Sequence, residues 1–131
     1  TKLLVGDGPS KKKLEKKYPD AVFVGAKKGN ELAQYYASSD IFVFPSKTDT
    51  FGMVMIEALA SGIPVAAYPV PGPNDVFDNF KHNTLDRNLS NSIDKARKVS
   101  RTDCLNYSKK FDWLEVSKLF LSHQSASRVA K

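Results

Sequence analysis

Short runs of apolar residues alternate with polar, glycine- and proline-containing segments along the first half of the chain. The run Ile41-Phe42-Val43-Phe44 has no polar position, as expected of a parallel strand that is covered on both faces. Between such runs, apolar residues recur at helical spacing, and glycine or proline punctuates the boundaries. Strands are therefore expected at residues 2–6, 21–24, 41–44 and 64–67, with helices at about 10–18, after Asn30 and at 51–61.

This alternation of strands and helices predicts βαβ units, and thus an α/β fold with a parallel sheet and right-handed crossovers. Beyond Tyr68 the pattern changes. Residues 69–74, which read PVPGPN, predict a rigid loop, and residues 123–131 are expected to fray. The remaining chain predicts helices at about 89–99, 103–110 and 112–122, the last of which carries Trp113, Val116, Leu119 and Phe120 as core residues.

Length and composition are those of an ordinary globular domain. The chain has 131 residues, of which 41% are apolar and 26% charged. It contains no apolar run of the roughly 18 residues that a membrane-spanning helix needs, and no signal-peptide pattern. The single cysteine, Cys104, favours a reducing compartment and a structural role. Because the sequence opens directly on an apolar strand, we expect it to be part of a longer protein.

The net charge of +6 raises the question of nucleic-acid binding, which the distribution of that charge disfavours. Basic residues crowd two separate predicted helices, and stacking aromatic residues do not alternate with them. No helix-turn-helix or zinc-finger spacing occurs either. We therefore expect no nucleic-acid partner, and interpret the lysines as a solvated face or as attraction to an anionic membrane or ligand.

Ligands of open α/β sheets bind beyond the carboxyl ends of the strands, which here are followed by residues 6–9, 25–28, 45–50 and 69–74. Gly6-Asp7-Gly8 lacks the third glycine of a dinucleotide fingerprint, and there is no P-loop or G-x-S-x-G pattern. His82 and His123 are far apart, so no metal site is expected, and each is interpreted as a surface residue.

The start of the helix near residue 51 is the strongest candidate site. Thr50-Phe51-Gly52 would expose backbone N–H groups where a helix begins, an arrangement that binds anions. Glu57 lies in the second turn and leans back toward that end, while Asp49 lies just ahead of it. Two carboxylates would suit sugar hydroxyls on either side of a diphosphate. Spacing alone also allows Asp49 or Thr50 to be an N-cap and Glu57 to pair with a lysine.

Several motifs together resemble those of family-4 (group 1) retaining glycosyltransferases. Residues 46–52 and 57–67, SKTDTFG and EALASGIPVAA, are similar to the family's E-x7-E signature. The resemblance extends to VGDGP at 5–9, VG at 24–25, ASSDIFVFPS at 37–46, and FDW at 111–113 with Val116, Phe120 and Leu121. It covers most of the chain, with the motifs in the family's order.

The resemblance implies one half of a GT-B fold: a Rossmann-like three-layer sandwich with a parallel sheet, followed by C-terminal helices. Residues 1–131 would be most of the C-terminal, nucleotide-sugar-binding domain, without its first strand and helix and without the N-terminal acceptor domain. The full-length enzyme would transfer a sugar, with retention and without metal or other cofactor, from a nucleotide-diphosphate sugar donor to a glycan or lipid-linked acceptor. It would be cytoplasmic, with peripheral association at the inner face of the membrane, and this fragment alone would be inactive.

The same resemblance implies roles for individual residues. Glu57 would bind the ribose hydroxyls, and Asp49, in the place of the motif's first glutamate, would face the donor sugar. These two carboxylates are the implied catalytic residues. The other implied nucleotide-sugar contacts are Gly6 in the cleft, Gly25 and Ala26 near the base, and Thr50, Phe51 and Gly52 by the diphosphate. Two departures weaken the match: Asp49 is about 1.5 Å shorter in reach than the family's glutamate, and PGPND at 71–75 replaces a Gly-Gly-x-x-Glu-like loop.

Two other functions remain open at this stage. A domain that keeps the fold but only binds nucleotide-sugar or a partner protein would share these motifs. A flavodoxin-like regulatory module is less well supported, because Asp7 stands alone where such modules carry an acidic cluster.

Overall fold

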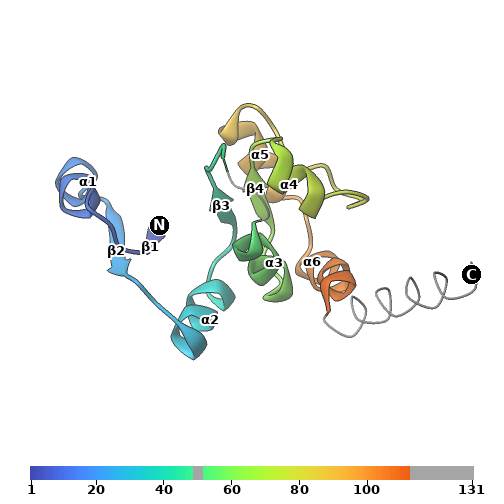
Figure 1. Ribbon diagram of the computed structural model, residues 1–131, viewed down its shortest axis with the longest axis horizontal. Helices are drawn as coiled ribbons and strands as arrows, with labels where there is room; N and C mark the ends of the chain where they lie inside the picture. The colour runs from blue at the N-terminus through green and yellow to red at the C-terminus, as the bar shows by residue number, and fades with distance from the viewer. Residues whose placement is uncertain (49–51, 113–131) are drawn as a thin grey trace, which may run out of the picture. The chain divides into compact units, whose positions relative to one another are not determined.

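The computed structural model describes residues 1–48 and 52–112, and these residues belong to two compact units (Figure 1). The first unit is Thr1–Tyr35 and the second begins at Tyr36. The predicted helix at 112–122 with Trp113, and the frayed segment at 123–131, lie outside the described residues.

The first unit contains a parallel strand pair with a helix as its crossover. β1 (Lys2–Val5) pairs with β2 (Ala21–Gly25), with Leu3 opposite Val22, and α1 (Lys11–Lys17) connects them. Beyond the paired residues, the Gly6 N–H donates to the Gly25 carbonyl at 2.8 Å. The strands and the helix expected in this part of the sequence are confirmed. α2 (Gly29–Ala37), also expected, runs from this unit into the start of the second.

The second unit holds most of the buried core. β3 (Phe42–Phe44) pairs in parallel with β4 (Val65–Ala67), in a register that puts Phe44 opposite Ala67. α3 (Met53–Ala60) is the crossover, and α4 (Pro71–Val76), α5 (Leu89–Ala96), α6 (Arg101–Ser108) and a 3-10 turn (Lys109–Phe111) follow. The largest fully buried apolar side chains are Met55, Leu59, Ile63, Val65, Val76, Pro73 and Cys104. The α5 and α6 helices confirm two predicted helices, with ends shifted by a few residues.

The end of α3 shows why Gly62 stops this helix. The Gly62 N–H bonds to the Leu59 carbonyl and the Ile63 N–H to the Ala58 carbonyl, each at 2.9 Å, the pattern of a Schellman motif. Gly62 has a φ of +72°, and a Cβ on it would lie 3.4 Å from Cγ of Leu105 in α6. The glycine predicted as a helix stop is therefore confirmed, and it also lets α6 pack closely.

The prediction of a rigid loop at 69–74 is wrong, because Pro71–Val76 form α4. Pro71 occupies the first helical turn, where a missing N–H costs nothing and the fixed φ of proline favours the helix. The Asn74 N–H then donates to the Val70 carbonyl, and the Phe77 N–H to the Pro73 carbonyl, each at 2.9 Å. The prolines that suggested an interruption thus begin a helix.

Candidate functional site

The amino end of α3 begins in the left-handed conformation that glycine adopts readily. Gly52 is its N-cap, with φ 69° and ψ 46°, and its carbonyl accepts the Met55 N–H at 2.9 Å. Gly52 has no side chain that could cap this end, and no capping side chain is found among residues 1–48 and 52–112. An amino end of this kind can bind an anion through its first-turn N–H groups, and for α3 that role stays a prediction.

Glu57 is held by a tyrosine from α2. The Tyr36 hydroxyl donates to Oε2 of Glu57 at 3.2 Å and lies 3.3 Å from the backbone carbonyl oxygen of Val54. Tyr36 is 9% exposed, whereas Glu57 is exposed. The Glu57 carboxylate is thus held beside the first turn of α3 while remaining accessible to solvent.

Tyr36 is uncharged, and its burial is the main reason that its pKa is raised. Burial raises the pKa of Tyr36 to about 12, with further contributions from the negative charge of Glu57 and the hydrogen bond to it. Near neutral pH the phenol therefore retains its proton and donates a hydrogen bond to the carboxylate. The alternative of a lysine partner for Glu57 is not found within residues 1–48 and 52–112.

The other predicted site residues are divided between the two units and the segment that is not described. Gly6, Gly25 and Ala26 belong to the first unit, where Gly6 and Gly25 meet at the carboxyl ends of β1 and β2. Gly52 and Glu57 belong to α3 of the second unit. Asp49, Thr50 and Phe51 lie outside the described residues, so their roles stay predictions.

Tyr36 is a residue whose role the sequence analysis missed. The sequence predicted only a helix after Asn30 in this region, and the ring of Tyr36 packs against Phe42 with centroids 5.6 Å apart. A buried tyrosine usually finds a partner for its hydroxyl, which is the signal that could have linked it to a carboxylate elsewhere. The sequence does not say which carboxylate.

A further polar cluster joins the loop after α4 to α6. Asp103 Oδ1 lies 2.7 Å from Lys81 Nζ and Oδ2 lies 2.8 Å from His82 Nε2. Lys81, followed by His82 and Ser100, lowers the pKa of Asp103 to about 2. His82 was expected at the surface, and its side chain is 32% exposed with this fixed partner. Nowhere in the described ranges do three His, Cys, Asp or Glu side chains gather as they would around a metal ion.

Cys104 and the charged surface bear on two other expectations. Cys104 is fully buried, and burial raises the pKa of its thiol to about 11, which confirms a structural role.

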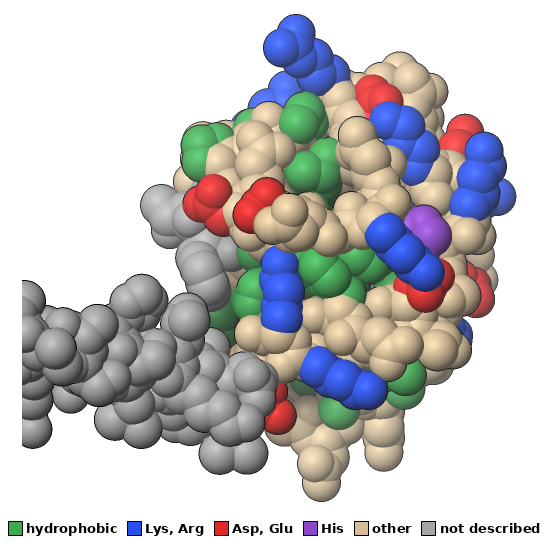
Figure 2. Space-filling view, turned by 90° about the vertical axis from the view of Figure 1, so that its right-hand side faces the viewer, with side chains coloured by type: hydrophobic (Ala, Val, Ile, Leu, Met, Phe, Trp, Pro, Cys, Tyr) green, Lys and Arg blue, Asp and Glu red, His purple; other side chains and the backbone are tan. Residues whose placement is uncertain are grey.

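On the face seen in Figure 2, Lys and Arg side chains are scattered among neutral and hydrophobic ones. Within the part of the chain that is described, no helix has both the length and the apolar character to cross a membrane.

Comparison with known proteins identifies the family. Residues 1–101 match the family described as Glycosyl transferases group 1. The chain belongs to this family. The resemblance predicted from the sequence motifs is therefore confirmed.

Individual relatives of this group 1 glycosyltransferase chain include proteins from plants and bacteria. It is 49% identical over 75 residues to sulfoquinovosyl transferase SQD2 of Arabidopsis thaliana, covering 56% of this chain and 15% of the relative. It is also 49% identical over 75 residues to a GDP-mannose-dependent alpha-mannosyltransferase of Mycobacterium tuberculosis, covering 57% of this chain and 20% of the relative. The matched part thus spans a fifth or less of the length of these two relatives.

Solved glycosyltransferase structures share the fold. The pneumococcal O-GlcNAc transferase GtfA, in complex with UDP and GlcNAc, superposes with a TM-score of 0.69 at 18% identity, over 92% of this chain and 28% of that one. Staphylococcus aureus TarM, in a complex that contains UDP, gives a TM-score of 0.64 at 23% identity, over 82% and 24% respectively. The predicted fold class, part of a GT-B glycosyltransferase with parallel strands and flanking helices, is confirmed.

Proposed function

We propose that this chain is the donor-binding part of a retaining glycosyltransferase. The full-length protein binds a nucleotide-diphosphate sugar and transfers the sugar to a glycan or lipid-linked acceptor without a metal ion. Family membership supports glycosyl transfer. The position of Glu57 beside the amino end of α3, where the N-cap is Gly52, supports the assignment of the donor site most directly.

Glu57 has the geometry of a ribose ligand. Oε2 accepts the Tyr36 hydroxyl, which restrains the rotation of the carboxylate. Oε1 has no partner among the described side chains, and an ionised carboxylate has lone pairs left for two neighbouring hydroxyls. Hydrogen bonds to a charged acceptor are the stronger kind, so a fixed carboxylate of this sort gives both affinity and orientation.

The amino end of α3 would receive the diphosphate. Its first-turn N–H groups and the positive end of the helix dipole favour negative charge. Charge on the diphosphate increases as the bond to the sugar breaks, so these groups stabilise the transition state more than the bound donor. In this proposal Thr50, Phe51 and Gly52 lie by the diphosphate, Asp49 faces the donor sugar, and Gly6, Gly25 and Ala26 approach the base.

The names of related proteins support the class of donor and acceptor. A relative from Mycobacterium tuberculosis is named as dependent on GDP-mannose, and a structural neighbour was solved with UDP. An alpha-monoglucosyldiacylglycerol synthase of Acholeplasma laidlawii is 35% identical over 86 residues, which are 60% of this chain and 20% of that protein. A lipid-linked acceptor at the inner face of the membrane, reached from the cytoplasm, is consistent with that relative.

Titration of the full-length protein with UDP and GDP tests the donor site. Glu57→Gln keeps the size of the side chain but removes its charge, and should weaken nucleotide binding by about tenfold or more, since hydrogen bonds to charged groups contribute roughly 1.5–3 kcal/mol. Asp94→Asn, which neutralises an exposed carboxylate on α5, serves as the control and should leave the dissociation constant unchanged. Equal affinities for Glu57→Gln and the wild type would rule out the ribose assignment.

Transfer assays separate an enzyme from a domain that only binds. With the acceptor supplied, Asp49→Asn in the full-length protein should abolish most turnover while nucleotide affinity stays close to wild type. An unchanged rate would contradict the sugar-facing role of Asp49. Nucleotide binding without any transfer by the wild-type protein would instead favour the non-catalytic alternative.

A further inference from the structure

We propose that a basic hollow at the carboxyl ends of β3 and β4 binds a second anionic group, a phosphate or sulfonate, through Lys47 and Arg87. The hollow has a volume of about 290 Å³ and is lined by Lys47, Tyr68, Pro69, Val70 and Arg87. None of these residues belongs to the set proposed above for the donor nucleotide. The inference that this anion is part of the donor sugar or of the acceptor rests on the proposed function.

The parallel pairing of β3 and β4 creates this hollow. Phe44 and Ala67 are the last paired residues of the two strands, so the segments that follow them leave the sheet at the same edge. Lys47 follows β3 and Tyr68 follows β4. Ligands of open α/β sheets bind at this edge. The hollow therefore lies where the fold presents its substrates.

Lys47 is oriented by an aromatic ring. Its Nζ lies 4.8 Å from the centroid of the Tyr68 ring. In a cation–π contact the ring attracts the positive charge of the ammonium group. The three N–H donors of that group are not used in a strong hydrogen bond to the ring. Lys47 can therefore bind an oxyanion without losing its position over the ring.

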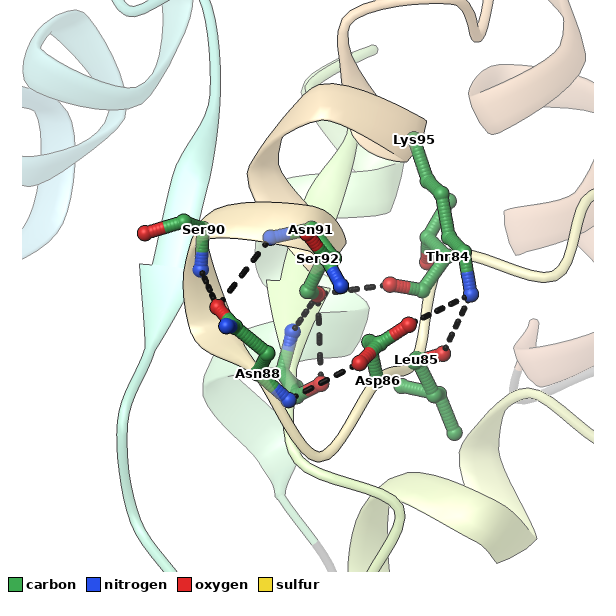
Figure 3. Close-up of polar contacts among 9 residues, drawn as sticks. Thr84, Leu85, Asp86, Asn88, Ser90, Asn91, Ser92 and Lys95 are labelled. Atoms are coloured by element: carbon green, nitrogen blue, oxygen red, sulfur yellow. Dashed lines mark hydrogen bonds and ion pairs between the residues drawn. The ribbon is translucent and has the colours of Figure 1, made fainter.

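The backbone on either side of Arg87 is anchored, as Figure 3 shows for its neighbours. The Asp86 N–H donates to the Ala67 carbonyl at 3.2 Å, which ties this segment to the end of β4. Asn88 is the N-cap of α5 and accepts the N–H groups of Ser90 and Asn91. The base of the Arg87 side chain is thus fixed beside the hollow, which reduces the entropy lost on binding.

Asp86 cannot easily neutralise Arg87, although it is adjacent in the sequence. Its Oδ2 lies 2.9 Å from Lys95 Nζ, and its Oδ1 accepts the Asn88 N–H at 2.8 Å (Figure 3). Lys95, followed by the Asn88 N–H, keeps the pKa of Asp86 below its ordinary value. Within the described ranges, Arg87 has no ion-pair partner and no carboxylate lines the hollow.

Lys47 and Arg87 place two positive charges on the lining of one hollow. An arginine can bind a tetrahedral oxyanion through two N–H groups, and a nearby lysine adds a second positive charge. Pro69 and Val70 add apolar surface to the same hollow. The lysine and the arginine together favour an anionic phosphate or sulfonate group over a neutral hydroxyl group.

Site-resolved labelling of lysines in the full-length protein tests this proposal. Lys47 would be acetylated by a limiting amine-reactive reagent, and its rate read by peptide mass spectrometry, with exposed Lys98 as the internal control. The soluble probes are glucose 6-phosphate and glucose, and the membrane probes are phosphatidylglycerol and phosphatidylcholine vesicles. We expect an anionic probe to slow the labelling of Lys47 at least threefold, and its neutral or zwitterionic counterpart to have no effect.

The two anionic probes distinguish the source of the group. Protection by glucose 6-phosphate alone supports a charged sugar, and protection by phosphatidylglycerol alone supports a lipid acceptor. Arg87→Ala should remove the protection, whereas Arg97→Ala, at the end of α5, should retain it. No protection by either anion, or equal protection in Arg87→Ala, would overturn the proposal. Because UDP affinity is measured separately through Glu57→Gln, loss of the donor assignment and loss of this anion site give different results.

Discussion

The hydroxyl of Tyr36 donates a hydrogen bond to Oε2 of Glu57 at 3.2 Å and so joins the end of α2 to α3. The contact places a neutral, buried donor against an exposed carboxylate. It restrains the carboxylate before any ligand is present, which is the condition under which a single side chain contributes most to orientation.

Removing this hydroxyl should weaken nucleotide binding without unfolding the protein. Tyr36→Phe keeps the ring contact with Phe42 but leaves Glu57 unrestrained. We expect about a fivefold loss of UDP or GDP affinity, corresponding to roughly 1 kcal/mol for one hydrogen bond, measured by calorimetric titration. Tyr18→Phe, at an exposed tyrosine, is the matched control. Identical affinities for Tyr36→Phe and Tyr18→Phe would contradict a positioning role for Tyr36.

Two tyrosines should make the protein sensitive to alkali. Burial raises the pKa of both Tyr36 and Tyr107 to about 12 from an ordinary value of 10.0. The unfolded chain then loses these protons first, so their contribution is complete below pH 10 and is lost as pH rises toward 12. Urea unfolding across this range should show a shallower decline in Tyr107→Phe than in the wild type. A decline as steep as that of wild type would mean that Tyr107 titrates normally.

Asp103 should make the protein sensitive to acid. Lys81 and His82 lower its pKa to about 2, below the ordinary 3.8. The folded state releases this proton more readily, so the stabilisation is present above pH 3.8 and is lost as pH falls toward 2. The free energy of unfolding should therefore decrease less steeply with acidification in Asp103→Asn than in the wild type. Asp94→Asn is expected to follow the wild-type curve.

The buried hydroxyl of Ser92 should be needed for stability, whereas that of Thr84 should not. Ser92 Oγ accepts the Ala67 N–H at 2.9 Å and lies 2.6 Å from the Thr84 carbonyl oxygen, which it can reach as a donor (Figure 3). Ser92→Ala should cost about 1–3 kcal/mol in urea unfolding, because buried backbone groups lose their partner.

Thr84 provides the matched comparison. It is 1% exposed, and its own hydroxyl has no hydrogen-bond partner in the described part of the chain. Thr84→Val removes an unsatisfied buried group while keeping the shape, so stability should be unchanged or higher. If Thr84→Val destabilised the protein as much as Ser92→Ala, the polar contacts would not be the cause.

Gly62→Ala should destabilise α3 and its packing on α6. The residue has a φ of +72°, and a methyl group there would approach Cγ of Leu105 to 3.4 Å. The left-handed conformation costs a non-glycine residue roughly 1–2 kcal/mol, which should lower the midpoint of thermal unfolding. Gly8→Ala is the control, because its φ is not positive and no atom lies within 4 Å of the added carbon. Equal midpoints for the two variants would contradict this account.

Much of the fold could be predicted because it depends on local chemistry. The apolar run that includes Phe42–Phe44 forms β3, and Gly62 ends α3 where the sequence predicted a stop. The one clear error, at Pro71–Val76, arose because proline was treated as a breaker at a position where a helix can begin. The proline residues marked a helix boundary, but helix propensity alone did not show whether a helix ends before them or begins with them.

The alternating elements, the glycine stop of α3 and Glu57 as a candidate ligand could be predicted without the structure, since each depends on residues within a few positions of one another. The folded arrangement was needed to find that Tyr36 holds Glu57, that Asp86 pairs with Lys95, and that Lys47 and Arg87 line one hollow. These partners lie on different elements, and the parallel pairing of β3 with β4 together with helix packing brings them close. Periodicity predicts which face of an element is buried, but it contains no information on which side chain that face will meet.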